Sequence, residues 1–120
     1  GSCFVHRLYG YRAVVLCCEP WCTAGRAWKR RMGVTKLLRG ELQPFYHCLV
    51  DERDRPGGQV TFVGEDNVTV DADTADAAFP LQHPLVPALL IRCDELKSYL
   101  PSPMLETALA AHRKGEDFRL

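Results

Sequence analysis

Two segments that are apolar on both of their alternating sides constrain the fold most. In residues 11–18, Val15 and Cys17 are expected to share one side and Leu16 and Cys18 the other, and both sides are mostly apolar. Residues 45–51 have the same character. Strands of this kind lie in the middle of a sheet that is covered on both faces. The chain is therefore predicted to be mainly β, with two central strands.

Turn residues and helix caps place the neighbouring elements. Residues 54–58 read Asp-Arg-Pro-Gly-Gly, and they predict a turn because proline presets φ while glycine accepts positive φ. This turn would join residues 45–51 to a strand at 59–63. Thr23 is expected to cap a short helix that runs to about Met32, with Gly33 as its left-handed stop and Trp28 as its buried anchor. Ala24, Ala27 and Met32 would share the stripe of Trp28.

The second half of the chain has a weaker pattern. Residues 71–78 are acidic and rich in alanine, which indicates an exposed loop or a mobile edge. Residues 83–87 are too rich in proline for a regular helix, and residues 89–93 are predicted to form a last strand. Ser102 and Pro103 predict the start of a C-terminal helix at about 103–114, with serine as the cap and proline in the first turn.

The six cysteines match no zinc-site spacing. Cys18 and Cys22 are spaced Cys-x3-Cys, and no second close pair of Cys or His follows them. The other four lie in or beside apolar stretches, which suits reduced thiols packed as small apolar side chains, with a disulfide or redox role as the alternative: Cys3, Cys17, Cys48 and Cys93. We expect no metal and no cofactor.

Charge is unevenly distributed although the formal net charge is zero. Residues 1–60 hold ten Lys and Arg against five Asp and Glu, and residues 61–120 hold five against ten. One interpretation is a pair of solvated faces that attract each other weakly across the fold. The other is a docking surface for an oppositely charged partner. A run without acidic residues carries most of the positive charge: Arg26, Lys29, Arg30, Arg31, Lys36 and Arg39.

Catalytic and membrane signals are missing from the sequence. It has no Gly-x-Ser-x-Gly elbow, glycine-rich phosphate loop or His-Glu-x-x-His motif. Its longest apolar runs, residues 13–18 and 85–91, are far shorter than the ~20 residues of a membrane helix. The sequence therefore predicts a protein that is not an enzyme.

Three motifs in fixed order carry a family resemblance: Tyr-Gly-Tyr at 9–11, Gln-Pro-Phe-Tyr at 43–46 and Glu-Asp-Asn at 65–67. With them the chain resembles the YccV-like, or hemimethylated-DNA-binding, domain family, best over residues 4–67 and more loosely to 105. Ala13 and Gly64 depart from the residues that relatives often have there, glycine and alanine. Length and composition predict one domain over residues 3–120, and Gly1-Ser2 is expected to be a cloning remnant. The expected fold of the domain is a small antiparallel SH3-like β-barrel with one short inserted helix and a C-terminal helix.

The resemblance also implies a function, because relatives include a bacterial heat-shock protein, a chloroplast adaptor of the Clp protease and an F-box-only protein. It implies a non-catalytic protein-binding adaptor or substrate-recognition module linked to regulated proteolysis. The expected partners are a Clp- or Lon-type protease, a chaperone or a ubiquitin-ligase component, together with a client protein. The expected location is intracellular: the chloroplast or another organelle, or else the cytoplasm or nucleus.

Two other functions stay open, a DNA-binding domain and a structural or oligomerisation domain. Aromatic side chains beside a basic helix suit a protein interface, and they also suit nucleic acid, where an aromatic stacks on a base while Arg and Lys hold phosphates. The alternative for the aromatics is that they close the end of the barrel. The candidate partner-binding residues are Tyr9, Tyr11, Trp21, Arg26, Trp28, Lys29 and Arg30.

Overall fold

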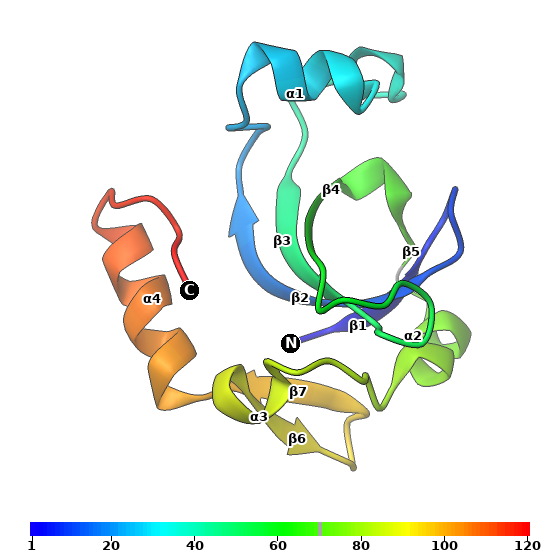
Figure 1. Ribbon diagram of the computed structural model, residues 1–120, viewed down its shortest axis with the longest axis vertical. Coiled ribbons are helices and arrows are strands. Elements are labelled where there is room, and N and C mark those ends of the chain that lie inside the picture. Colours follow the sequence, from blue (N-terminus) through cyan, green and yellow to red (C-terminus); the bar gives the residue numbers. More distant parts are fainter. Residues whose placement is uncertain (70) are drawn as a thin grey trace.

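A five-stranded antiparallel sheet forms the centre of the protein (Figure 1), in a computed structural model that describes residues 1–69 and 71–120. Its strand order is β4-β3-β2-β1-β5. The two apolar segments of the sequence are the central strands β2 and β3, so the prediction of a mainly β fold is confirmed. The strand bounds are β1 Cys3–His6, β2 Arg12–Glu19, β3 Phe45–Val50, β4 Val60–Gly64 and β5 Val68–Thr69.

The sheet curls strongly without closing. Its edge strands β4 and β5 are joined by a single 3-10 turn, η2, at Glu65–Asn67, and Figure 1 shows this segment bending back towards β1. Within residues 1–69 and 71–120, no hydrogen-bonded pairing joins β4 to β5. The closed SH3-like barrel therefore stays a prediction.

A β-bulge in β2 changes which face its last residues occupy. Val15 lies opposite Cys48, but the next pair is Cys17 with His47, so Leu16 is the extra residue. Opposed residues share a face of the sheet. Cys17 therefore lies on the same face of the sheet as Leu16. The prediction that Cys17 and Val15 share a face is wrong, because a strict two-residue alternation does not allow for the bulge.

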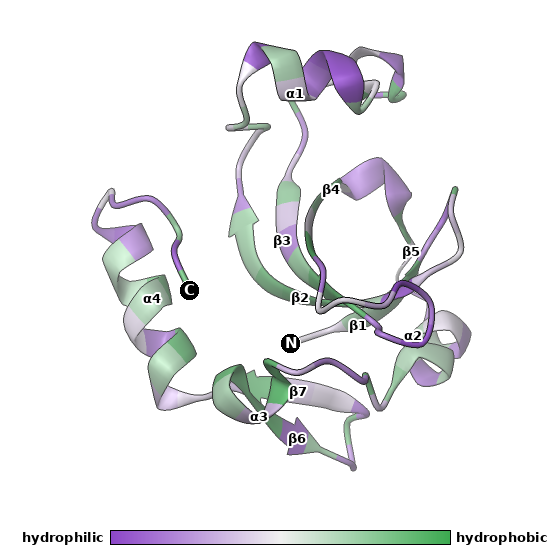
Figure 2. Cartoon of the chain, in the orientation of Figure 1, coloured by the Kyte–Doolittle hydropathy of each residue, from purple (hydrophilic) through white to green (hydrophobic). Residues whose placement is uncertain are grey.

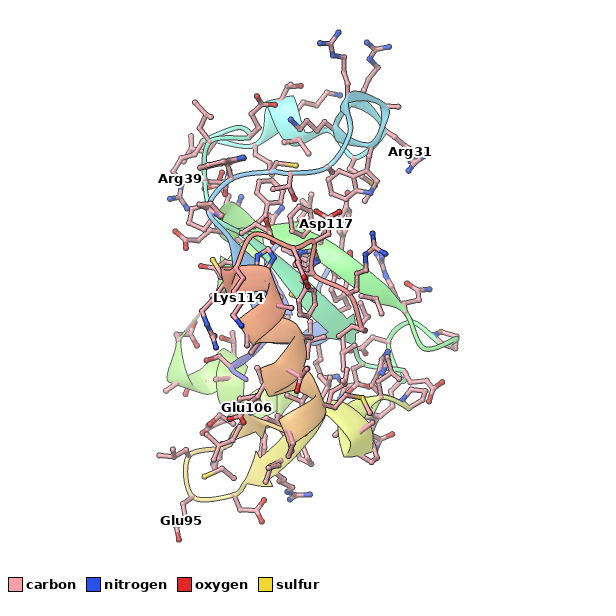
Figure 3. All side chains as sticks on the ribbon, turned by 90° about the vertical axis from the view of Figure 1, so that its left-hand side faces the viewer. Arg31, Arg39, Glu95, Glu106, Lys114 and Asp117 are labelled. Atoms are coloured by element: carbon pink, nitrogen blue, oxygen red, sulfur yellow. The ribbon has the colours of Figure 1, made fainter. Side chains whose placement is uncertain are left out.

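A second layer covers this face of the sheet. It consists of α2 (Ala72–Ala78), α3 (Val86–Leu89), a β6–β7 hairpin (Leu90–Cys93 and Ser98–Pro101) and α4 (Pro103–Arg113). In Figure 3, α4 lies in front of the sheet, with α1 above it and the hairpin below it. Between the layers lies the largest apolar core, formed by Cys3, Val14, Leu16, Leu49, Ala78, Leu81, Leu89, Leu90, Tyr99 and Leu105.

Two predictions for this layer are wrong. Residues 72–78 form α2 rather than a loop, because Asp71 caps the helix by accepting a 2.8 Å hydrogen bond from the Thr74 N–H and Ala78 is buried. The proline-rich segment also continues into a short helix, α3, since Pro87 lies in its first turn, where no backbone donor is needed. Helix α4 starts as expected, with the Ser102 hydroxyl accepting from the Leu105 N–H.

Helix α1 (Arg26–Arg31) and the turn η1 (Val34–Lys36) stand above one end of the sheet. Gly25, not Thr23, is the N-cap, without a side-chain hydrogen bond. Gly33 has φ +67°, as expected of a left-handed stop. Figure 2 shows most of α1 as hydrophilic, in contrast to β2 and β3. Ala27 and Met32 are exposed, whereas Trp28 and Ala24 are partly buried, so the predicted apolar stripe is too broad.

Candidate functional site: a basic, aromatic groove

A groove of about 420 Å³ lies between the α1–η1 segment and the turn that joins β1 to β2. We call it the α1 groove. Phe45 of β3 and residues 61–64 of β4 also line it. Large apolar side chains line it while remaining exposed, which is typical of a surface that receives another molecule: Leu8, Tyr9, Met32 and Leu38.

One wall of the groove is a stack of rings around His6. The His6 ring lies 4.8 Å from the Tyr9 ring and 4.7 Å from the Tyr11 ring. The Arg55 guanidinium sits over both tyrosines, 4.6 Å from the Tyr11 centroid and 5.5 Å from that of Tyr9. Stacking and cation–π contacts of this kind hold a side chain in place. Tyr9 is thus fixed although 59% of it is exposed.

His6 also shapes the turn. Its Nδ1 accepts hydrogen bonds from the Leu8 and Tyr9 N–H groups, at 3.2 and 3.0 Å, and Gly10 completes the turn with φ +73°. Burial, and next the positive charge of Arg55, lower the pKa of His6 to about 4. A neutral imidazole is the form that can accept at Nδ1. His6 is therefore a structural element of the groove wall.

Trp28 forms the opposite wall. Its ring lies 5.9 Å from that of Phe62, which in turn lies 5.1 Å from Phe45. Gly64 makes this packing possible, because a Cβ there would lie 3.0 Å from Phe45 Cζ and 3.1 Å from Leu37 Cδ1. The glycine at position 64 thus fits a tightly packed floor, in which a methyl group would require the Phe45 and Leu37 side chains to shift.

The rim of the groove is basic. Arg7, Arg31, Lys36 and Arg55 line it, and no acidic side chain does so among the described residues. The nearby acidic pair Glu65–Asp66 is occupied elsewhere: Arg39 contacts Asp66 Oδ1 at 2.8 Å and Glu65 Oε1 at 3.1 Å. These contacts join the basic first half of the chain to its acidic second half. Contacts of this kind are what the interpretation of two weakly attracting faces expects. The excess charge left at the groove is positive.

The structure brings together three of the seven candidate residues. Tyr9, Tyr11 and Trp28 line the α1 groove, whereas Trp21, Arg26, Lys29 and Arg30 do not. Lys29 is paired with Glu41 at 3.1 Å. Sequence reasoning missed the four basic rim residues as a set. Arg31 and Lys36 belong to the basic run it identified, but Arg7 and Arg55 come from two turns whose meeting no local pattern reveals.

Other surfaces offer less. A depression of about 600 Å³ beside α4 is lined by small side chains and charges of both signs: Met104, Thr107, Ala108, Ala111, Glu116, Asp117 and Arg119.

Among the described residues, no helix has the length and apolar character needed to cross a membrane.

Comparison with known proteins agrees with the sequence motifs. The family model described as "Hemimethylated DNA-binding protein YccV like" matches residues 1–97. Proteins named F-box only protein 21, from Homo sapiens, Mus musculus and Pongo abelii, are each 30% identical over 80 residues. That alignment covers 67% of this chain and 12% of each relative.

Proposed function

This chain is a member of the YccV-like family, and from that premise we propose that it is a non-catalytic protein-binding adaptor or substrate-recognition module linked to regulated proteolysis. The α1 groove carries the proposal, because it combines exposed, fixed aromatic side chains with a one-signed rim. The segment it takes is acidic and presents an apolar side chain to Tyr9 and Trp28. Similarity to F-box only protein 21 favours a ubiquitin ligase over a Clp- or Lon-type protease as the destination.

The physics of the groove supports recognition of a protein segment. Tyr9 is already held by His6 and Arg55, so binding costs little side-chain entropy. Tyr, Trp and Arg are the residues that most often dominate interface energies. The basic rim would speed encounter with an acidic segment and disfavour basic ones. These properties need no reacting group, which is why the proposal is a binding function.

DNA binding is the second candidate, and the same basic rim favours it. Four basic side chains would neutralise at most four phosphates, which predicts a salt dependence with a slope of about −4 or shallower. The formal net charge of zero removes the long-range attraction that DNA-binding domains commonly have. Protein recognition is therefore the function that the geometry supports best.

The test is a nuclease-treated pull-down read by mass spectrometry. The bait is compared with a groove variant, Tyr9→Ala with Arg31→Glu and Lys36→Glu, all at exposed positions. The matched control reverses two exposed charges on and just after α4, Arg113→Glu with Lys114→Glu. We expect the wild type and the control to recover ubiquitin-ligase, protease or chaperone subunits and the groove variant to lose them. Recovery that is equal for all three baits would overturn the proposal.

A second arm measures DNA directly. Fluorescence anisotropy compares a hemimethylated duplex with the unmethylated duplex of the same sequence, over a range of salt concentrations. The adaptor proposal expects only weak, non-specific binding, at roughly micromolar or worse. Tighter binding that prefers the hemimethylated duplex and is lost in the groove variant would assign the groove to DNA instead.

A further inference from the structure

A cluster of potential metal ligands lies where α4 packs against β2 and β3, and Phe62 separates it from the α1 groove. The Cys17 thiol, a Glu19 carboxylate oxygen and a His112 ring nitrogen all lie within 4.8 Å of one another. Cys17 and Glu19 are two residues apart on β2, beyond the bulge, and so share one face. His47 lies opposite Cys17 on β3 and faces the same way.

Glu19 is the centre of this cluster. The residue is only 6% exposed. Its Oε1 lies 2.6 Å from His112 Nε2 and 3.5 Å from His47 Nε2. A buried carboxylate that meets two imidazoles and a thiol, rather than Lys or Arg, has the donor atoms of a metal site.

The hydrogen bonds of His112 determine which of its nitrogens is free to bind. Its Nδ1 lies 2.9 Å from the Glu116 carbonyl oxygen. A carbonyl only accepts, so Nδ1 carries the hydrogen, and in the neutral ring Nε2 presents a lone pair to Glu19 Oε1. In the metal-free protein a proton on Nε2 bridges this 2.6 Å contact as an ion pair, and a divalent ion that displaced the proton would lie between the same two atoms. Metal-bound histidines are typically fixed in this way, with the second ring N–H donated to a carbonyl or carboxylate.

An apolar shell covers part of the cluster. Phe62 and Phe118 lie on the His47 ring, with centroid distances of 4.5 and 4.9 Å. Phe118 also contacts the His112 ring edge-on at 6.1 Å. Figure 3 shows the segment after α4 turning back towards the sheet near Asp117. Such a shell limits access of water and strengthens the attraction between a cation and its ligands.

We propose that Cys17, Glu19 and His112 bind a zinc-type divalent metal ion with water in the fourth position, and that His47 contacts the Glu19 carboxylate beside it. A tetrahedral zinc site with bonds of about 2.0–2.3 Å places its donor atoms about 3.3–3.7 Å apart. The donor atoms here would reach that spacing by small side-chain rotations. On binding, the Cys17 thiol releases its proton to solvent and coordinates as the thiolate. The ion would tie α4 to β2.

The proposal is independent of the α1 groove and is tested on the full chain. A background variant, Cys18→Ser with Cys93→Ser, removes the more accessible thiols. It is freed of metal and titrated with Co²⁺, whose thiolate charge-transfer absorption reports sulfur ligation, and with Zn²⁺ by calorimetry. We expect one equivalent of Zn²⁺, the charge-transfer band, and a higher Tm with Zn²⁺ bound.

Two further variants in this background locate the ion. Cys17→Ser should abolish the charge-transfer band, and His112→Gln should weaken Zn²⁺ binding by more than the roughly 10- to 100-fold typical of losing an outer hydrogen-bond partner. Arg113→Gln, one residue along, is the matched control and should bind as the background does. Circular dichroism checks each fold, and if Cys17→Ser unfolds, His112→Gln decides because His112 is partly exposed. No Zn²⁺ binding by the background, or equal binding by His112→Gln, would overturn the proposal.

Discussion

Replacing Asp51 by Asn should destabilise the protein strongly, because this carboxylate connects three segments while fully buried, at 0% exposure. Oδ1 accepts from the Arg53 backbone N–H and from Arg53 Nε, both at 2.9 Å. Oδ2 accepts from Arg53 Nη2 at 2.7 Å and from the Gln82 N–H at 3.0 Å. The end of β3, the following turn and the segment before α3 thus meet at one side chain.

The pKa of Asp51 gives the magnitude. Burial raises this pKa, but the hydrogen bonds from the Arg53 side chain and from backbone N–H groups outweigh burial and lower it to about 2. Relative to the ordinary aspartate pKa of 3.8, this lower pKa contributes about 2 kcal/mol to the free energy of unfolding at neutral pH. Asparagine also turns an N–H₂ group towards donors. We expect Asp51→Asn to lower the free energy of unfolding by about 2–4 kcal/mol.

Urea denaturation of wild type and variant at about pH 7 and about pH 3 tests this value. The native pKa lies below the unfolded one, so the stabilisation is complete above about pH 4 and is lost as pH falls towards 2. The gap between the two proteins should narrow by about 1 kcal/mol at the lower pH. The matched control, Glu52→Gln at the exposed neighbouring position, should change stability by less than about 0.5 kcal/mol. An equal loss in both variants, or a gap that does not change with pH, would refute the reasoning.

Three further perturbations follow from local geometry. The pKa of His6 is lowered to about 4 in the folded protein. The free energy of unfolding of the wild type should therefore fall by on the order of 2–3 kcal/mol as pH falls from about 6.5 to 4. In His6→Asn, the urea midpoint should change less over the same pH range. Gly10→Ala meets no steric contact but must adopt φ +73°, so it should cost about 1 kcal/mol in a thermal melt, and no cost would contradict the described turn. Ser102→Ala removes the hydrogen bond from the Leu105 N–H that caps α4 and the 2.7 Å hydrogen bond to the Ala88 carbonyl. Urea denaturation should show a free energy of unfolding lower by about 1–2 kcal/mol. The control Ser98→Ala should leave it unchanged.

The residue pattern correctly predicted the strands and helix ends that are determined by residues close together in the sequence. Strands β2 and β3 follow from two-sided apolar runs, and the start of α4 follows from serine and proline at its cap. Helix α2 was not predicted because its sequence is polar and short, and because an aspartate such as Asp71 is equally common as a helix cap and as a loop residue. The bulge at Leu16 was not predicted because the alternation of a regular strand assumes that no residue is inserted.

The two candidate sites depend on contacts that sequence cannot supply. Arg7 and Arg55 reach the α1 groove from turns that only the curl of the sheet brings together. Cys17, Glu19 and His112 have no metal-site spacing, and they meet because the bulge turns Cys17 towards α4. Single aromatic residues were better indicators, since Tyr9, Tyr11 and Trp28 are at the groove.

Family boundaries and the physical unit do not coincide in this protein. The family model ends at residue 97, whereas Tyr99 and Leu105, from β7 and α4, pack against Leu16 and Leu49 of the sheet. A fragment designed to the family boundary would lack β7 and α4 and would leave part of that side of the sheet uncovered, and uncovered apolar strands adhere to many proteins indiscriminately. Bait designed in this way would return abundant false partners, so interaction screens need the residues through α4.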